Sequence, residues 1–375
     1  MTASNGQASN GRANESGHSA GRRIEGFALG NGVWATAVPF PSPLAYSYSY
    51  ALAFPAGVVV VDLGWDSDEA WQAFCSGLAR AGVALDDIVG VVVTHAHPDH
   101  YGLARRIKAA TSAWIGLHPA ERALITVDAA ERRQRLAEIA EWLRRCGAPA
   151  AELARLEAEI GELEAALTNI EPDVELTDGS PVPGTDGGLV ALHTPGHTPG
   201  HLCFYDRDRD VLLTGDHVLP RITPNVAKRP GSDLDPLHDF LGSLRLLGTC
   251  PPTTLVLPGH EWTFDRLPDR LAALERHHDV RLTEVEDAVR GGCGTVWEVA
   301  QVITWARPVS SFSPRSLRSA LAETYSHLFH LSQLGRLDHT PGEPARFTVR
   351  GLTVHGATRS GGLATPVDSP PRARG

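Results

Sequence analysis

The chain has 375 residues, of which 42% are hydrophobic and 21% are charged. This is the composition of a soluble globular protein that can bury a sizeable core and has room for two domains. The formal net charge of −10 disfavours a large nucleic-acid interface, because phosphates bind to basic faces, and no apolar run reaches the ~20 residues that a membrane-spanning helix needs.

The two ends of the sequence are predicted to be disordered. Residues 1–25 are rich in Ser, Asn and Gly, and residues 357–375 have a similar low-complexity composition. The N-terminal segment lacks the apolar stretch of a secretory signal, and the five cysteines are scattered without a CxxC motif. Both features predict a cytoplasmic protein.

Short β-branched segments alternate with helical patterns between these tails. The segment "GVVVVDLG" at 57–64 is followed by a helix-periodic segment at 66–82 that has acidic residues at its start. Further strand-like segments lie at 88–95, 189–194, 211–217 and 253–260. This alternation predicts an α/β layered domain over residues 26–268.

Residues 119–170 differ from the segments around them. They are charged, rich in Ala and Leu and helix-periodic, and "CGAP" at 146–149 divides them into two helices. We interpret them as a helical hairpin inserted in the α/β domain. Its role is either packing, or that of a lid or dimer contact over the site, which makes it a candidate surface for a homodimer.

The strand-like segment at 88–95 ends in "THAHPDH". His95 and His97 are two residues apart, so in extended backbone both imidazoles lie on the same side. Pro98 allows a helix to start there, which places Asp99 and His100 in its first turn. A single histidine after a strand is usually a surface residue, but four ligand-type residues in six positions predict a metal site.

Three further segments contain metal-ligand types. "HTPGHTPGH" spaces His193, His197 and His201 with Pro-Gly turns, which alone would often be only a tight loop. Asp216 follows a strand in "LLTGDH", and His260 follows one in "VLPGHEW". Each of the last two is weak alone, but together with the first motif they indicate two metals rather than one.

With these motifs in this order, residues 26–268 resemble the metallo-β-lactamase-fold hydrolases. "THAHPDH" matches the signature of that family, "HTPGHTPGH" its third-ligand loop, "TGDH" its bridging aspartate and "LPGHE" its last histidine. The resemblance implies an α/β fold, a four-layer αββα sandwich with the site at one edge of its two sheets. Here the sandwich would contain the helical-hairpin insertion and precede a small C-terminal domain.

The resemblance also implies a set of ligands for two divalent metal ions. The implied ligands are His95, His97 and His197 for one metal, Asp99, His100 and His260 for the other, and Asp216 as a bridge. In the family pattern "TPGHT" the ligand is the histidine after the first Pro-Gly, so His193 and His201 are expected either to orient ligands through hydrogen bonds or to be structural. We expect zinc, with iron or manganese as alternatives that the same ligands accept.

Two adjacent metals suggest a hydrolytic mechanism. They lower the pKa of a shared water from 15.7 to roughly 7, so that a metal-bound hydroxide can attack while one metal polarises the carbonyl or phosphoryl oxygen. Asp99 is the candidate catalytic residue that accepts a proton from the nucleophile. No GxSxG motif is present, and no Ser-His-Asp triad is needed.

The C-terminal part is predicted to form a separate domain over residues 269–356. Three helices are expected at 270–289, 295–305 and 313–337, with His277 and His278 on a solvated face, and a β-hairpin at 345–356. This pattern resembles the winged-helix-like tail of metallo-β-lactamase-fold proteins of the β-lactamase-like-protein-2 type. Residues 270–350 contain ten arginines against nine Asp or Glu, so we expect packing or substrate gating rather than nucleic-acid binding.

Several functions fit these motifs. We favour hydrolysis of a thioester, ester or lactone in a small-molecule substrate, as in glyoxalase II-like and lactonase-like relatives, because "TPGHTPGH" and "GHE" resemble that branch. An endoribonuclease or other phosphodiesterase is supported by the C-terminal domain and opposed by the acidic charge. A persulfide dioxygenase-like oxygenase would use the same histidines with one iron, and a metal-binding scaffold would use them without catalysis.

Overall fold

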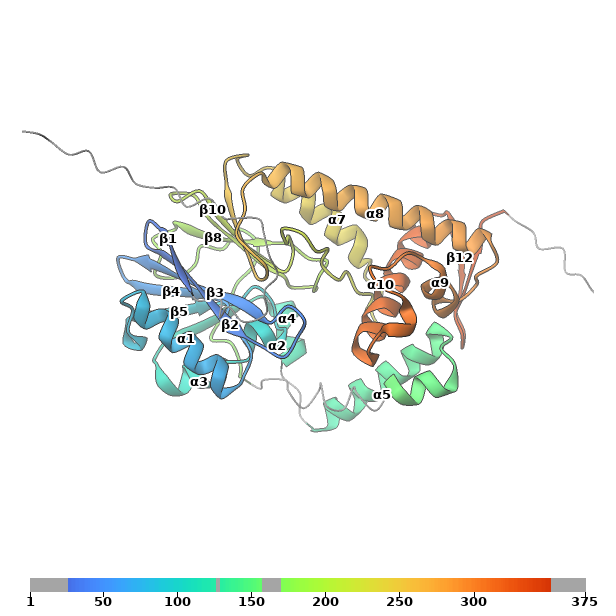
Figure 1. Ribbon diagram of the computed structural model, residues 1–375, viewed down its shortest axis with the longest axis horizontal. Helices are drawn as coiled ribbons and strands as arrows, with labels where there is room; N and C mark the ends of the chain where they lie inside the picture. Colours follow the sequence, from blue (N-terminus) through green and yellow to red (C-terminus); the bar gives the residue numbers. More distant parts are fainter. Residues whose placement is uncertain (1–25, 126–128, 157–169, 352–375) are drawn as a thin grey trace, which may run out of the picture.

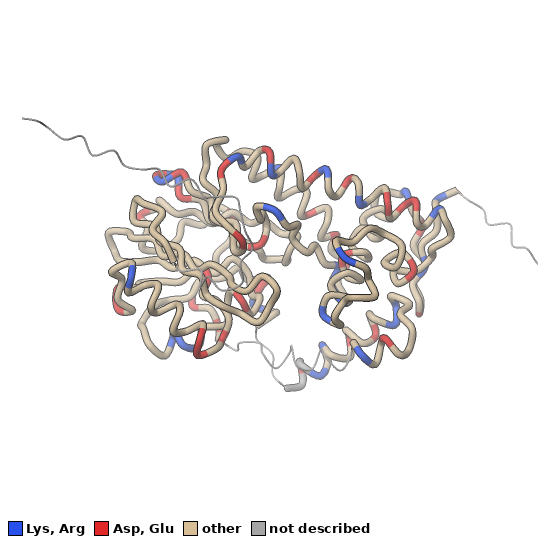
Figure 2. The backbone as a smooth tube through the Cα atoms, viewed as in Figure 1, with Lys and Arg blue, Asp and Glu red and all other residues tan. Residues whose placement is uncertain are grey.

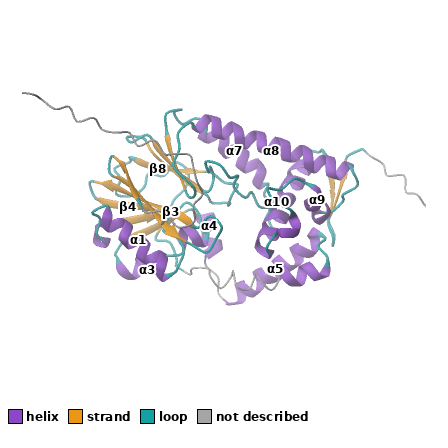
Figure 3. Ribbon diagram, viewed as in Figure 1, coloured by secondary structure: helices purple, strands orange, loops and turns teal. Residues whose placement is uncertain are grey.

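The computed structural model describes residues 26–125, 129–156 and 170–351. Two packed sheets with flanking helices form the N-terminal lobe, and a mainly helical lobe follows it (Figures 1 and 3). The predicted disordered tails, 1–25 and 357–375, lie outside the described residues.

The first sheet has seven strands within the described residues, and they are hydrogen-bonded in sequence order. Neighbours from β1 to β4 are antiparallel, whereas β4, β5, β6 and β7 run parallel. The strands are β1 (Phe27–Gly30), β2 (Val33–Pro39), β3 (Tyr46–Phe54), β4 (Gly57–Val61), β5 (Ile88–Val92), β6 (Trp114–Leu117) and β7 (Val174–Glu175).

The second sheet has the order β11-β10-β9-β8. Only the β10–β11 pair is parallel among its described pairs. The strands are β8 (Leu189–His193), β9 (Leu202–Asp206), β10 (Val211–Gly215) and β11 (Leu255–Pro258).

The valine-rich strand β4 shows how the layers are built. Side chains alternate between the two faces of a strand, so Val58 and Val60 pack toward the helical layer while Val59 and Val61 pack toward the second sheet. The helices of the first lobe are α1 (Asp68–Arg80), α2 (Pro98–Tyr101), α3 (Ala104–Ala110) and α4 (Pro119–Ile125), and α7 (Pro236–Leu247) covers the second sheet. The predicted αββα sandwich is therefore confirmed.

The C-terminal lobe contains the three predicted helices and a two-stranded hairpin. They are α8 (Leu267–Arg290), α9 (Val296–Val302), α10 (Pro314–Gln333), β12 (Leu337–Thr340) and β13 (Arg346–Val349). The hairpin begins before the predicted 345–356, because α10 ends at Gln333 and Gly335, with φ 69°, turns the chain directly into β12. The winged-helix assignment stays a prediction.

The expectation for the histidine pair of α8 was wrong at His278. That side chain is only 1% exposed, and its Nδ1 lies 3.1 Å from Nε2 of His327 on α10. Charged residues of both signs do recur along the length of α8 (Figure 2). The face of α8 that contains His278 is covered by α10.

The inserted helices pack against the C-terminal lobe. Helix α5 (Ala129–Cys146) ends before Gly147, which has φ 81°, and residues 150–156 are again helical. The Trp142 ring stacks on Tyr325 with centroids 6.4 Å apart, and the Ala345 N–H donates to the carbonyl of Arg145 at 2.9 Å. Residues 157–169 of the predicted hairpin lie outside the described part of the chain.

None of the described helices combines the length and apolarity needed to cross a bilayer.

Truncation of Leu143 should test the packing between the insertion and the C-terminal lobe. Leu143 is fully buried in the cluster shared by α5, α8 and α10, so Leu143→Ala should lower the free energy of unfolding by about 2–5 kcal/mol. The control Leu334→Ala removes the same atoms from a side chain that is 54% exposed and should cost less than about 0.5 kcal/mol. Equal costs in urea denaturation would contradict this packing.

Candidate metal centre

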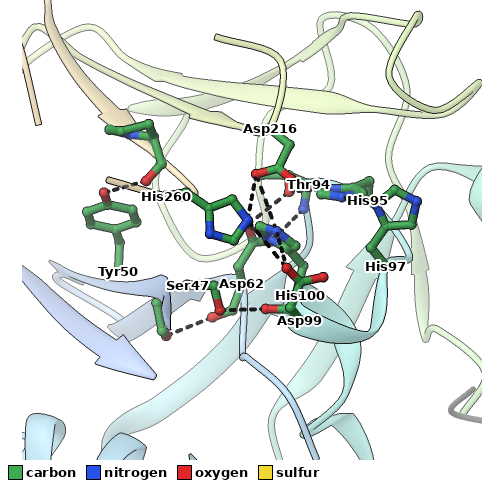
Figure 4. A network of polar contacts seen from close by, with 12 residues as sticks. Ser47, Tyr50, Asp62, Thr94, His95, His97, Asp99, His100, Asp216 and His260 are labelled. Carbon is green, nitrogen blue, oxygen red and sulfur yellow. Dashed lines mark hydrogen bonds and ion pairs between the residues drawn. The ribbon is translucent and has the colours of Figure 1, made fainter. Parts of the chain in front are cut away.

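Seven polar side chains meet where strands of the two sheets end, and Figure 4 labels all of them except His197. Four of them come from the corner between β5 and α2, and the others follow β8, β10 and β11. Their potential ligand atoms form two groups, and within each group these atoms lie within 4.8 Å of one another. The groups are His95, His97, His197 and Asp216, and Asp99, His100 and His260. All seven residues named from the sequence are thus brought together.

Asp216 lies between the two groups. Its Oδ2 is 3.8 Å from His197 Nε2, while its Oδ1 is 3.4 Å from His100 Nε2 and 3.2 Å from His260 Nε2. Figure 4 shows the carboxylate between His260 on one side and His95 on the other. This arrangement allows one carboxylate to serve two cations.

The three histidines of the first group are held neutral. Burial lowers the pKa of His95 and His97 well below the usual value, and the neighbouring imidazoles lower it further. Burial also lowers the pKa of His197, whose Nδ1 lies 2.8 Å from the carbonyl of Asn225. A neutral imidazole is the form that binds a metal, so this group is ready for a cation at neutral pH.

The two histidines of the second group hold protons instead. Burial alone would lower the pKa of His260, but the carboxylates of Asp216 and Asp99 outweigh it and raise the pKa to about 10. The pKa of His100 is raised well above its usual value by Asp216, Asp62 and Asp99, again against the effect of burial. Without a cation, these protons balance the buried carboxylates.

The donor set fits divalent metal ions. Asp216 Oδ1 and His100 Nε2 are buried and make ionic contacts but no hydrogen bond among the described residues, so a cation that binds them would satisfy both atoms. A Cβ on Gly259 would lie 2.6 Å from Asp216 Oδ1, so only glycine lets this loop approach so closely. Imidazoles and carboxylates are ligands that zinc and iron accept.

Asp62 contacts one of the candidate ligands, His100, and was not predicted from the sequence. Its carboxylate, at the end of β4, accepts the Thr94 N–H at 2.7 Å and lies 2.8 Å from His100 Nδ1. It therefore fixes which nitrogen of His100 faces the site. The available signal was an aspartate directly after a valine strand in "VVVVDLG", which alone is too common to interpret.

Glu121, on α4, is the second missed residue. Its fully buried carboxylate accepts the Ala96 N–H through Oε2 and the Gly200 N–H through Oε1, both at 2.8 Å. These two donors lie in the two loops that contain His95, His97 and His197. One carboxylate therefore ties together loops about a hundred residues apart in sequence.

The loop of His260 is held by strand β3. The hydroxyl of Tyr46 donates to the carbonyl of Glu261, and that of Tyr50 donates to the carbonyl of Pro258, both at 2.7 Å. Nδ1 of His260 lies 3.0 Å from the carbonyl of Tyr46, which leaves Nε2 to face the site. The first sheet thus positions a ligand that follows the second sheet.

His193 and His201 do not orient ligands through the hydrogen bonds expected of them. His193 Nε2 lies 2.9 Å from the carbonyl of Pro199, and its ring stacks on His118. His201 lies beside His95, with ring centroids 5.2 Å apart, but its Nδ1 contacts the hydroxyl of Thr194 at 2.9 Å. Within the described residues, Asp62 rather than either of them orients an imidazole of the site.

A cavity of about 510 Å³ opens onto the centre. His97, Asp99 and His260 line it at the sandwich, and its other walls come from α5, α10 and the loop around Arg229. The inserted helices therefore both pack against the C-terminal lobe and line the space in front of the candidate ligands.

Comparison with known proteins agrees with this geometry. Residues 43–260 match the Metallo-beta-lactamase superfamily. The chain is 28% identical over 237 residues to a probable metallo-hydrolase, YqjP, of Bacillus subtilis, covering 62% of this chain and 72% of the relative. It is 29% identical over 203 residues to the acyl-coenzyme A thioesterase MBLAC2 of Bos taurus, covering 51% and 64%.

A solved structure extends the likeness into the C-terminal lobe. The metallo-beta-lactamase family protein TTHA1429 of Thermus thermophilus superposes with a TM-score of 0.71 at 28% identity. The superposition covers 86% of this chain and all of that one.

Metal binding to the second group should depend steeply on pH. A cation at Asp99, His100 and His260 must displace two protons, so its apparent affinity should rise up to about 100-fold per pH unit between pH 6 and 9, tenfold per proton. The first group, neutral over that range, should change far less. Zinc titration of the metal-free protein in chelator buffers at several pH values measures both slopes, and equal slopes would contradict the assignment.

Removal of the charge of Glu121 should weaken metal binding without changing a candidate ligand. Glu121→Gln replaces one acceptor by an NH₂ group that faces a backbone N–H, so zinc affinity should fall about 10–100-fold. The matched control is Glu69→Gln on the exposed side of α1, which should bind zinc like the wild type. Equal zinc affinities of the wild type, Glu121→Gln and Glu69→Gln would show that metal binding does not depend on the two hydrogen bonds that Glu121 accepts.

Proposed function

The chain belongs to the metallo-beta-lactamase superfamily, and on that premise we propose that it is a hydrolase with two divalent cations that cleaves a thioester, ester or lactone. The observation that supports this most directly is the carboxylate of Asp216, whose two oxygens face two different groups of imidazoles. A single-metal site would not need the second group.

The candidate ligands divide between the two cations. His95, His97 and His197 would hold one cation, Asp99, His100 and His260 the other, and Asp216 would contact both. When bound, such a pair polarises a carbonyl oxygen and lowers the pKa of a coordinated water. The mixed set of imidazoles and carboxylates favours zinc, and iron and manganese are the alternatives.

The chain itself contributes orientation and a proton acceptor. Asp99 lines the cavity, and although burial opposes ionisation, His100 and His260 lower its pKa to about 2. It is therefore ionised at neutral pH and can hold a proton from the nucleophile only transiently, at a carboxylate oxygen. Asp62, Glu121 and the tyrosines of β3 keep the imidazoles in place, so the reacting groups need little rearrangement.

The relatives support hydrolysis, and one of them supports the thioester. YqjP is named a probable metallo-hydrolase and MBLAC2 an acyl-coenzyme A thioesterase, each under 30% identical to this chain. An acyl carbonyl placed beside the two groups of candidate ligands would lie in a cavity that is large enough for a small molecule.

His97→Ala and Asp216→Ala should each reduce hydrolysis of a thioester and lactone panel to the background rate. The first loses a ligand of one group and the second the contact shared by both, while the valine-rich sheets remain intact. The control His238→Ala removes an exposed imidazole from α7 and should retain wild-type kcat/KM.

Metal content measured by mass spectrometry on the same proteins decides between reaction types. About two equivalents in the wild type, with hydrolysis, would support the proposal. One equivalent of iron without hydrolysis, or undiminished turnover in either variant, would refute it.

A further inference from the structure

The cavity in front of the candidate ligands has a cationic wall. Besides the acids of the metal centre, Glu138 is the acidic residue among its described lining residues. The cationic lining residues are Arg135, Lys228, Arg229, Arg315 and Arg318. Figure 2 shows blue positions on α5 and α10, which lie across from the sandwich. This local excess of positive charge contrasts with the net charge of −10 for the chain.

One of these cations is already engaged. The ammonium of Lys228 donates to the carbonyls of Ser232 and Leu234, the latter at 2.6 Å, and lies 3.7 Å from the ring centroid of Phe329. The ammonium charge of Lys228 is therefore satisfied within the chain. The arginines provide the positive charge that faces the cavity.

Two of the arginines form no direct ion pair within the described residues. Neither Arg229 nor Arg315 forms an ion pair with a described carboxylate. Arg315 and Arg318 are three residues apart on α10, so their side chains leave the same face of the helix. Burial lowers the pKa of the Arg229 guanidinium although the carboxylate of Glu121 raises it, so an anion in the cavity would stabilise this desolvated charge further.

Arg229 also connects the cationic wall to the metal centre. It lines the same cavity as the candidate ligands His97 and His197, so its guanidinium group and these imidazoles face one space. Arg315 reaches the same cavity from the C-terminal lobe. The cations thus extend from the metal centre toward α10 along one cavity.

Apolar side chains share this cavity. Ile139 and Trp142 of α5 are 8% and 6% exposed and line it together with Ala322 of α10. A ligand that fills the cavity therefore meets both guanidinium groups and an apolar surface.

We propose that the substrate carries an oxyanion, a phosphate or a carboxylate, that binds Arg229 and Arg315 while its acyl bond lies at the metal centre. Guanidinium groups bind both kinds of oxyanion through paired, charge-assisted hydrogen bonds. This inference rests on the proposed hydrolase function and specifies the chemistry of its substrate.

Binding of non-hydrolysable thioethers to the metal-loaded full-length chain tests the inference without turnover. The probes are two matched pairs, S-butyl 4′-phosphopantetheine against S-butyl pantetheine, and N-acetyl-S-butyl glutathione against its diethyl ester. Calorimetry should give a Kd at least about tenfold lower for the charged member of one pair, and the pair that responds identifies the phosphate or the carboxylate.

Arg315→Gln should remove most of that preference and leave the Kd of the neutral thioethers unchanged. Arg276→Gln, an equal loss of charge on the exposed side of α8 outside the cavity, should keep the preference. Arg229→Gln provides a second variant if Arg315→Gln does not fold.

Two results would overturn the inference. One is equal or undetectable binding of charged and neutral thioethers, and the other is an equal loss of the preference for the charged thioether in the Arg315→Gln and Arg276→Gln variants. Failure of the proposed function is seen separately, because it would leave the corresponding butyryl thioesters uncleaved whatever the thioethers bind.

Discussion

The centre depends on a buried carboxylate that has to be compensated. Asp216 faces one group of imidazoles with each oxygen, and burial of its charge would be prohibitive without cations beside it. In the metal-free chain the protons on His100 and His260 supply that charge, and bound cations would replace them. The contacts of Asp62 with His100 and of Tyr46 with His260 hold two imidazoles beside this carboxylate.

The sandwich brings the imidazoles close enough to Asp216 to compensate its charge. The ligands follow β5, β8, β10 and β11, strands of two sheets whose valine and leucine side chains interlock between them. Contacts across the sheets then set the details: Tyr50 of the first sheet bonds to the loop after β11 of the second, and Glu121 joins the loops after β5 and β8. The rigidity of the centre therefore comes from the packing of two layers rather than from any single loop.

The parts of this molecule that were predictable from sequence are those whose pattern is local. The spacing of His95, His97, Asp99 and His100 is contained in six residues after a buried strand, and the alternation of strands and helices indicated the layers. Asp62 and Glu121 were not predictable, because each is a lone carboxylate whose partners lie 25 to 79 residues away. His278 was misplaced for the same reason, since α10, which covers it, follows almost 40 residues later along the chain.

Net charge also proved a poor guide to the site. An acidic chain can still build a cationic cavity, because the local field depends on the few charges that face the cavity and not on the net charge of the chain. The arginines that line the cavity come from a loop, the inserted α5 and the C-terminal α10, three segments that the sandwich itself does not require. The fold thus separates two regions: strand ends of the sandwich hold the candidate ligands, and the added helices, which pack on one another through Trp142 and Tyr325, line the cavity in front of them.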